Sequence, residues 1–187
     1  GVGAAAPNQP PRPPPARPQQ QAKKPQVPRR GQVNYTTAEE VQEGSEVLMG
    51  TLLVNSHPTK VLFDSGASHS FVNKSYATQH NLKIYPTRSP LLINAPGAEI
   101  IVKTLVPGVC LLEKNPDLQA NLLVIDLKGI DIIIGMNWLT LYDAIIHVAK
   151  RIISLKDPSG GRIFLHLGKE KSGLYHLEAA AIPDISS

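Results

Sequence analysis

The sequence predicts an all-β domain with one or two short helices, preceded by a disordered, proline-rich tail. Short runs of Val, Leu and Ile, separated by proline, glycine or charged residues, recur from residue 46 to residue 177. This spacing is typical of many short strands rather than of strands alternating with long helices. Hydrophobic residues make up 42% of the chain, which is enough for one core. We therefore divide the chain into a linker (1–44), one domain (45–177) and a short tail (178–187).

The linker has a biased composition. Residues 1–30 contain nine of the 17 prolines and six Lys or Arg side chains, with no acidic residue and almost no bulky apolar residue. Such a segment cannot bury enough surface to offset its ordering entropy, so we expect disorder. The basic side chains allow weak contact with nucleic-acid phosphates. A solvated linker is favoured, because these residues include no aromatic side chain for base stacking. Residues 31–44 are a polar transition with an expected helical turn at 37–42.

The first elements of the domain are a hairpin and a helix. Two runs rich in Val and Leu, at 46–55 and 59–63, are separated by Ser-His-Pro at 56–58. Apolar runs around a turn signal predict a β-hairpin. Residues 73–81 predict a short helix.

A second hairpin and a second helix follow. Pro96 and Gly97 suit the two central positions of a type II turn, so residues 91–102 predict a hairpin with an unusually apolar surface. Residues 130–135 form an apolar run that ends in glycine, and a helix is expected in 136–142. The other short apolar runs, up to residue 177, are predicted strands.

Composition excludes several classes of site. The chain has one cysteine, Cys110, so it has no internal disulfide and no site built from several cysteines. The six histidines show no ligand spacing, so we expect neither a metal nor another cofactor. No run of 18 apolar residues predicts a membrane helix, and the beginning of the chain does not resemble a signal peptide. These features favour a reducing, cytoplasmic setting without secretion.

One acidic residue stands at the end of a strand that is expected to be buried. Asp64 follows Val-Leu-Phe and precedes Ser65, Gly66 and Ala67. Burial favours the protonated form of a carboxyl, and the small residues allow another chain to approach it closely. The alternative is an ordinary turn in which Asp64 accepts backbone hydrogen bonds. A nucleophilic serine is not indicated, because the G-x-S-x-G spacing is absent.

Taken in order, these motifs resemble the retropepsin-like aspartic proteases. The set is Val-Leu-Phe-Asp-Ser-Gly-Ala at 61–67, the Pro-Gly hairpin, and Ile-Ile-Ile-Gly followed by Met-Asn-Trp-Leu at 132–139. The resemblance covers residues 45–157, and it is strongest to the protease of plant gypsy-type LTR retrotransposon Gag-Pol polyproteins. It implies a half-barrel acid-protease fold and an aspartic endopeptidase that processes its own polyprotein, in the cytoplasm within a virus-like particle.

The resemblance also implies roles for particular residues. The chain has one Asp-Ser-Gly triplet, so two copies would pair, with Asp64 of each as the catalytic carboxyl. Ser65 would hydrogen-bond across the dimer, Gly66 and Ala67 would leave room for the two loops, and Gly135 would give clearance beneath them. A flap that covers an extended peptide substrate would be formed by Ala95, Pro96, Gly97 and Ala98. Asn137 replaces an Asp found in many relatives, and we expect it to affect packing or capping.

Two alternatives remain from the sequence alone. The domain is either a protease or a catalytically inactive module that dimerises and binds extended peptides. A fragment that binds nucleic acid through its basic tail is the other class. Among single residues, Trp138 is expected to be a core anchor, His69 a loop residue and Cys110 a buried small hydrophobe. Asp126 and Asp131 are expected in turns.

Overall fold

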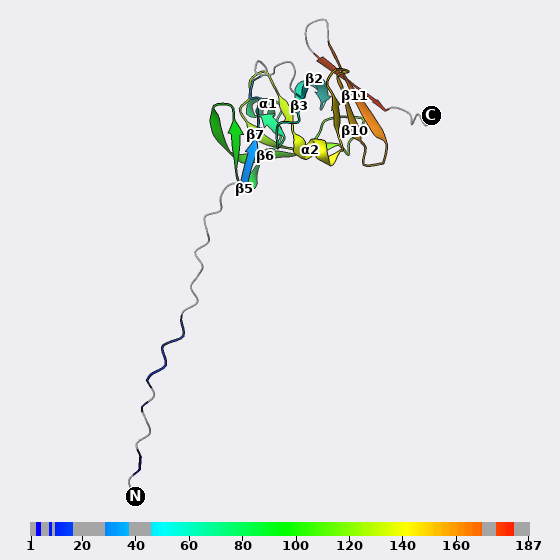
Figure 1. Ribbon diagram of the computed structural model, residues 1–187. Helices are drawn as coiled ribbons and strands as arrows, with labels where there is room; N and C mark the ends of the chain where they lie inside the picture. The colour runs from blue at the N-terminus through cyan, green and yellow to red at the C-terminus, as the bar shows by residue number, and fades with distance from the viewer. Residues whose placement is uncertain are drawn as a thin grey trace.

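The structure, a computed structural model, describes residues 3–4, 8, 10–16, 29–37, 46–169 and 175–181. Within these ranges, twelve strands form one sheet, and two short helices pack against it (Figure 1). The strand order is β1-β5-β6-β7-β4-β8-β3-β2-β12-β11-β10-β9. Among the described residues, no helix is both long and apolar enough to cross a membrane. The all-β prediction with one or two short helices is therefore confirmed.

The elements have the following bounds. The strands are β1 (Arg29–Gln32), β2 (Val47–Val54), β3 (His57–Asp64), β4 (Phe71–Asn73), β5 (Tyr85–Ala95), β6 (Ala98–Cys110), β7 (Gln119–Ile125), β8 (Ile132–Ile134), β9 (Ile145–His147), β10 (Ile152–Lys156), β11 (Arg162–Lys169) and β12 (Tyr175–Ala181). The helices are α1 (Lys74–Gln79) and α2 (Met136–Leu141), both where the sequence predicts them.

The centre of the sheet is buried on both faces. β3 and β8 pair in parallel, with Val61 opposite Ile132 and Phe63 opposite Ile134. All residues of 61–63 and 132–134 have 0% of their surface exposed. Alternate side chains enter two different hydrophobic clusters, one on each side of the strands. This explains why both segments are continuous apolar runs instead of alternating ones.

The turn of the first hairpin lies earlier than predicted. Val54 pairs with His57, so Asn55 and Ser56 alone make the turn. Their φ angles of 50° and 64° lie in the left-handed region. Two such residues give the turn whose twist matches that of the flanking strands. The prediction of a turn at 56–58 is therefore wrong for His57 and Pro58, which begin β3.

Residues 29–37 correct the predicted linker boundary. β1 pairs in parallel with β5, and Val33 is 1% exposed within the second hydrophobic cluster. The predicted disorder of 1–44 is thus wrong for these nine residues. Residues 10–16 are exposed and belong to no strand or helix, and most other residues of 1–28 lie outside the described ranges. Of the helical turn expected at 37–42, only Thr37 is described, and it forms a parallel bridge with Lys128.

The C-terminal boundary also differs from the prediction. β12 continues to Ala181, past the predicted domain end at residue 177. It pairs with β11 along its length and meets β2 where His176 lies opposite Thr51. Residues 182–187 lie outside the described ranges.

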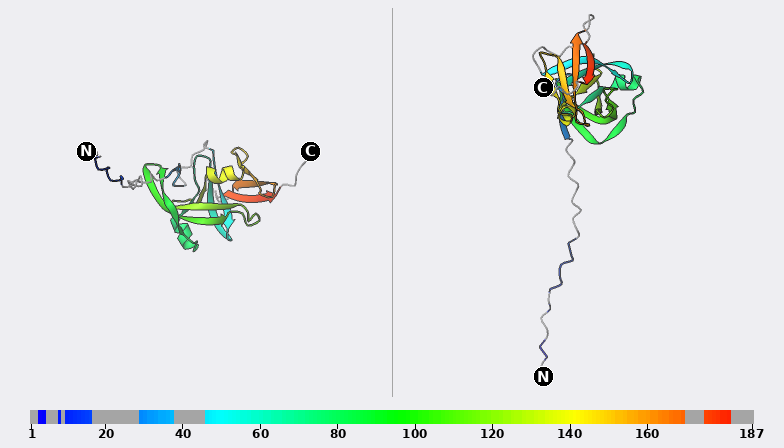
Figure 2. Two further views of the ribbon diagram at one scale, coloured as in Figure 1. Left: turned by 90° about the horizontal axis from the view of Figure 1, so that it is seen from below. Right: turned by 90° about the vertical axis from the view of Figure 1, so that its right-hand side faces the viewer.

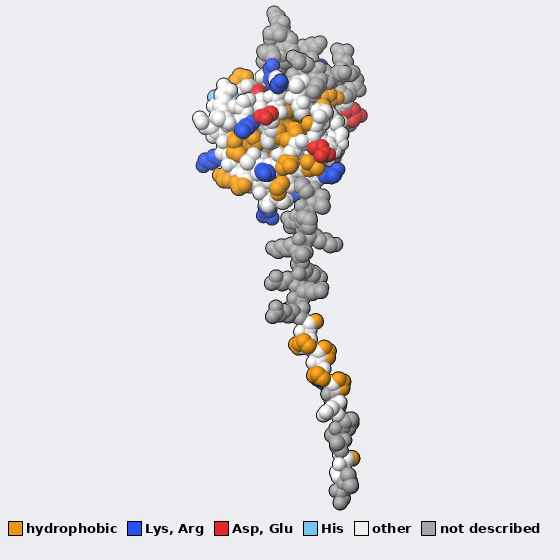
Figure 3. All heavy atoms as spheres, turned by 90° about the vertical axis from the view of Figure 1, so that its left-hand side faces the viewer, with side chains coloured by type: hydrophobic (Ala, Val, Ile, Leu, Met, Phe, Trp, Pro, Cys, Tyr) orange, Lys and Arg blue, Asp and Glu red, His pale blue; other side chains and the backbone are white. Residues whose placement is uncertain are grey.

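The two ends of the molecule are built from different hairpins. Figure 2 shows β5 and β6 (green) at one end and β10 to β12 (orange to red) at the other, with α2 between them. Figure 3 looks onto the end that carries the β5–β6 hairpin, where hydrophobic side chains gather between basic ones. The exposed large hydrophobic residues of this hairpin are Tyr85 (48%) and Ile101 (59%). Within the predicted hairpin 91–102, Ile101 is the exposed large hydrophobic residue, whereas Leu91, Ile93 and Val102 are buried in the second hydrophobic cluster. The unusually apolar surface predicted there is therefore mostly turned into the core.

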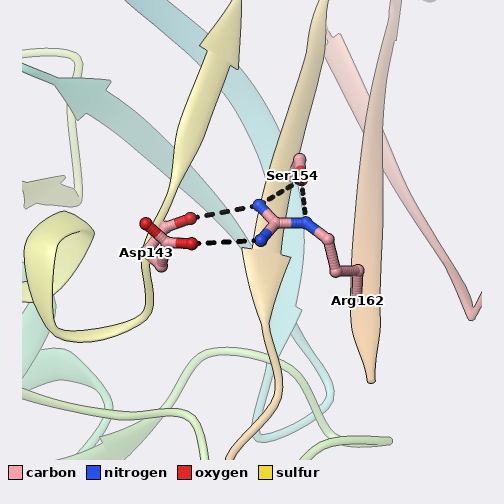
Figure 4. Close-up of polar contacts among 3 residues, drawn as sticks. All are labelled: Asp143, Ser154 and Arg162. Atoms are coloured by element: carbon pink, nitrogen blue, oxygen red, sulfur yellow. Dashed lines mark hydrogen bonds and ion pairs between the residues drawn. The ribbon is translucent and has the colours of Figure 1, made fainter. Parts of the chain in front are cut away.

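Arg162 ties the segment after α2 to the β10–β11 hairpin (Figure 4). Its guanidinium donates from Nε and Nη2 to Ser154 Oγ, at 2.9 and 2.6 Å. It also donates from Nη1 to Asp143 Oδ2 at 3.2 Å and from Nη2 to Asp143 O at 3.1 Å. Ser154 is 3% exposed, so these bonds satisfy a buried hydroxyl group. They hold the chain that leaves α2 against the body of the sheet.

Candidate active site

Asp64 lies at the end of β3 with its carboxylate buried. The residue is 1% exposed. Its Oδ1 accepts a hydrogen bond from Gly66 N–H at 2.8 Å, whereas its Oδ2 has no hydrogen-bond partner among the described residues. Burial raises the pKa of Asp64 above its ordinary value, and the N–H groups of Gly66 and Ala67 oppose this rise. The loop thus holds one oxygen of the carboxylate and not the other.

Ser65 is bonded within its own chain. Its hydroxyl lies 3.1 Å from Glu46 O and 3.2 Å from Glu46 Oε2, and its N–H donates to Glu46 O at 3.3 Å. These contacts fix the loop against the residue that precedes β2. Glu46 was not predicted as part of the site, because an exposed acid before a strand carries no distinguishing signal in the sequence.

Gly66 and Ala67 fill the closest part of the loop. A Cβ at Gly66 would collide with the amide nitrogen of Asn34 and lie 3.1 Å from Asp64 Oδ1. Ala67 is 0% exposed and belongs to the second cluster. A larger residue at Gly66 would thus have to displace the Asn34 side chain and crowd Asp64, and Ala67 is enclosed by the core. Asn34 was not predicted as a site residue, since it lies in the stretch assigned to the linker.

The loop is fastened to the start of α2. Met136 N–H donates to Ala67 O at 2.7 Å, and Asn137 N–H donates to Ser68 O at 3.3 Å. These donors belong to the first turn of the helix, where no carbonyl of the helix is available to accept them. Asp64 is thereby positioned from two directions, by β3 and by α2.

Ser70 strengthens the same connection. Its Oγ accepts from Gly135 N–H at 3.0 Å and donates to Asn137 Oδ1 at 2.8 Å. Ser70 is 1% exposed. Asn137 therefore has a structural role close to the loop, as expected, and its partner Ser70 was not anticipated.

Gly135 lies directly beneath the loop. A Cβ at this position would overlap the carbonyl oxygen of His69 and lie 2.7 Å from that of Ala67. Both atoms are backbone, so neither can rotate away. The expected clearance role of Gly135 is thus visible in the contacts of the chain.

The predicted Pro-Gly turn closes the β5–β6 hairpin. Ala95 pairs with Ala98, which leaves Pro96 and Gly97 as the turn residues. The φ angle of Gly97 is 72°, as the third position of a type II turn requires. A Cβ at Gly97 would have no neighbour within 4 Å. The tip is therefore open, with glycine needed for its backbone conformation.

Three other candidates have structural roles. Trp138 is 2% exposed, and its ring centroid lies 6.2 Å from that of Phe63, which confirms a core anchor. His69 shares a hydrogen bond of 2.8 Å with Ser68 Oγ and makes none with Asp64. Burial, with a smaller contribution from the charge of Arg29, lowers the pKa of His69. Cys110 is half-buried and not fully buried as predicted, and its Sγ lies 3.1 Å from Leu112 O.

The two acidic residues that were predicted to lie in turns, Asp131 and Asp126, have different surroundings. Asp131 immediately precedes β8 and is bonded to β3: its Oδ2 accepts from Lys60 N–H at 2.8 Å, and its N–H donates to Lys60 O at 3.0 Å. Asp126 is exposed just after β7. Within the part of the chain that the structure describes, no group of three or more His, Cys, Asp or Glu side chains is placed to hold a metal ion.

Comparison with known families agrees with this geometry. A family model described as retroviral aspartyl protease matches residues 28–160. The chain belongs to the retroviral aspartyl protease family. The match begins just before β1, so the family's domain includes residues that composition alone assigns to the linker. It contains Asp64, the β5–β6 hairpin and Gly135.

Solved structures and curated proteins were also compared. Among solved structures, the chain is similar to the retroviral protease-like domain of Ddi1 from Leishmania major, with 19% sequence identity and a TM-score of 0.41. That alignment covers 59% of this chain and 90% of the Ddi1 domain. No curated protein matches the chain significantly.

The buried carboxyl of this retroviral-type protease domain gives stability a defined dependence on pH. Because the pKa of Asp64 is raised in the folded chain, folding is penalised once the unfolded carboxyl ionises, near the ordinary value of 3.8. The penalty grows as the pH rises from there to the raised pKa. We expect Asp64→Asn to stabilise the chain at pH 7, and this gain to disappear below about pH 3.

Urea unfolding from pH 3 to 8, at a concentration where the chain is monomeric, measures this effect. Asp126→Asn makes the same change at an exposed position, so subtracting its series isolates the effect of burial. A gain for Asp64→Asn that stayed constant down to pH 3 would contradict the raised pKa.

Proposed function

We propose that the protein is an aspartic endopeptidase that works as a homodimer, with one Asp64 from each chain. The observation that carries this proposal is the carboxylate of Asp64, which is 1% exposed and has one oxygen without a partner among the described residues. A buried polar atom without a partner is costly. A second carboxyl facing it, with one shared proton, would satisfy that oxygen and hold the catalytic water.

The pair of carboxyls would divide the chemistry between them. Like charges at such a short distance do not both ionise, so one carboxyl keeps its proton while the other is charged. The charged one accepts a proton from water as the water oxygen bonds to the scissile carbonyl carbon. The protonated one donates its proton to the carbonyl oxygen. The resulting diol then breaks its C–N bond: one carboxyl gives its proton to the leaving nitrogen, and a diol hydroxyl gives its proton to the other carboxylate, which restores the single shared proton.

The surface beside Asp64 supports pairing of two chains. Ser65 lies at the edge of a hollow of about 410 Å³, whose lining is Glu46, Ser65, Met136, Leu139, Thr140, Asp143, Ala144, Ile145 and Ile146. Large apolar side chains are exposed there, with Met136 42% and Ile145 48% exposed. Exposed apolar surface next to a polar rim is typical of protein contacts. Ser65 would exchange its contact with Glu46 for one with the partner's loop.

The β5–β6 hairpin suits the role of a flap. Its tip from Ala95 to Ala98 is exposed or half-exposed. A Cβ built at Gly97 would have no neighbouring atom within 4 Å. Closing such a tip over an extended peptide would exclude water and fix the scissile bond. The substrate would be a polyprotein that contains this domain, encoded by a plant gypsy-type retrotransposon and processed in the cytoplasm within a particle.

The dimer requirement gives a test that uses mixed chains. Where all chains are paired, adding an equal amount of Asp64→Asn chain is expected to lower peptide cleavage to about half. The total number of dimers doubles, but after random pairing only about one quarter of them contain two Asp64 carboxyls. At low concentration, cleavage by the unsubstituted chain should rise faster than linearly with protein.

Cleavage unaffected by the added variant would show that a single chain is sufficient, and the proposal would fail. Chains that pair and bind peptides without cleaving them, tested on peptides from their own polyprotein, would instead support the inactive binding module.

A further inference from the structure

The N-terminal segment (residues 29–37) has no part in the chemistry above, yet it lies along the β5–β6 hairpin. It pairs in parallel with β5, from Arg29 opposite Leu91 to Gln32 opposite Asn94. Val33 N–H then donates to Asn94 O at 2.9 Å. Asn94 immediately precedes the turn of the proposed flap. One edge of the segment is therefore held by the flap arm.

The other edge is held by the loop that carries Asp64. Gln32 N–H donates to Ser68 Oγ at 2.6 Å, and Ser68 N–H donates to Gln32 O at 2.9 Å. Further along, Lys128 N–H donates to Thr36 O at 2.9 Å. Pairing of an extended chain with the edge of a sheet is the way in which strand addition binds peptides, and here the opposite edge of the chain is held as well.

The side chains of the segment also meet the catalytic loop. The amide nitrogen of Asn34 lies against Gly66, two residues from Asp64. Val33 is 1% exposed in the second cluster, with Leu91 and Ile93. Gly31 is so close to its neighbours that a Cβ there would lie 2.6 Å from His69 Nδ1. The segment thus fills the space between the flap arm and the Asp64 loop.

We propose that the N-terminal segment occupies the peptide site of its own chain and competes there with peptides from other molecules. Here the peptide site means the space between β5 and the loop of residues 64–68. This inference rests on the proposed function only for the statement that this space receives substrate. In the state described, the chain is blocked by its own residues, and the segment must leave before a substrate enters.

The contacts of the segment define the ligand that this site accepts. It is an extended peptide whose backbone N–H and C=O at one position pair with Ser68. The next side chain is a branched apolar one, as Val33 is, and the one after it is an amide, as in Asn34. When the site is mostly filled in cis, the apparent affinity for an added peptide equals its intrinsic affinity multiplied by the fraction of chains whose site is open.

Displacing the segment is the direct test. The full chain carrying Asp64→Asn, which removes cleavage, is titrated into a fluorescein-labelled peptide with the sequence of residues 30–37. Adding Val33→Asp places a charge in the buried site of Val33 and should expel the segment. We expect the Kd for the peptide to fall by about tenfold or more. Lys114→Ala changes the net charge equally at an exposed position outside the segment and should leave the Kd unchanged.

Hydrogen exchange distinguishes local opening of the segment from unfolding of the whole domain. In the full Asp64→Asn chain, amides of residues 29–37 should exchange faster than those of β3 and β8, because a competing segment opens without global unfolding. Exchange of both regions at one common rate, or a Val33→Asp chain that binds the peptide no better than Lys114→Ala, would overturn the inference.

The binding result is independent of catalysis. If the unsubstituted chain cleaves peptides but displacement does not improve binding, the proposed function stands and self-occupancy fails. If displacement improves binding but the unsubstituted chain never cleaves, self-occupancy stands and the proposed protease function fails.

Discussion

Replacing Asp64 with Asn is expected to abolish peptide cleavage, lowering kcat/KM by about a thousandfold or more. The amide can still accept the Gly66 N–H bond at the position of Oδ1, so the loop keeps its anchor. It cannot accept a proton from water, and it cannot share one with a second carboxyl. Since each dimer would contain the substitution twice, both the base and the acid of the proposed mechanism are lost.

Cleavage of a labelled polyprotein peptide from pH 4 to 7 measures this loss. Asp126→Asn is the matched control, since it makes the same chemical change at an exposed position. It should keep full activity. Circular dichroism separates loss of chemistry from loss of fold, and the Asp64→Asn chain should be at least as stable as the original at pH 7. Residual cleavage equal to that of the original chain would place the chemistry elsewhere.

The site was predictable where its signal is local in the sequence. An apolar strand followed by Asp64 and three small residues predicts a carboxyl in a tight loop. The structure contains that loop. Gly135 was also found, because an apolar run that ends in glycine before a helix is a recognisable pattern. Its partners, the carbonyls of Ala67 and His69, lie more than sixty residues away in the chain. The pattern therefore predicts that another part of the chain comes close to Gly135, but it does not identify that part.

The N-terminal segment was missed for a physical reason. Val33 and Tyr35 are the apolar positions of a short polar stretch that follows a proline-rich one. Their alternation is a strand signal, but two positions are too few to distinguish a strand from a linker. The energy that orders them comes from β5 and the second cluster, about sixty residues further along the chain. Pairing between distant segments, and the resulting contacts at Asn34 and Ser68, cannot be read from local composition.

Gly135→Ala is expected to destabilise the domain strongly, by about 3 kcal/mol or more in the free energy of unfolding. The reason is steric and not conformational. With φ −105° and ψ −171°, Gly135 has an extended backbone that any residue adopts. The added Cβ would overlap His69 O and approach Ala67 O to 2.7 Å. To make room, the loop must move away from α2, which strains the bond of 2.7 Å from Met136 N–H to Ala67 O.

Urea unfolding at one fixed protein concentration measures the cost, because dimer formation would otherwise add to stability. Gly161→Ala is the matched control: a Cβ there meets nothing within 4 Å, and its φ is not in the left-handed region. Its expected change is within about 0.5 kcal/mol. A Gly135→Ala chain as stable as Gly161→Ala would mean that the loop of residues 64–69 moves away from α2 without a loss in the free energy of unfolding. The position of Asp64 would then not depend on α2, and β3 alone would have to hold the carboxyl in place.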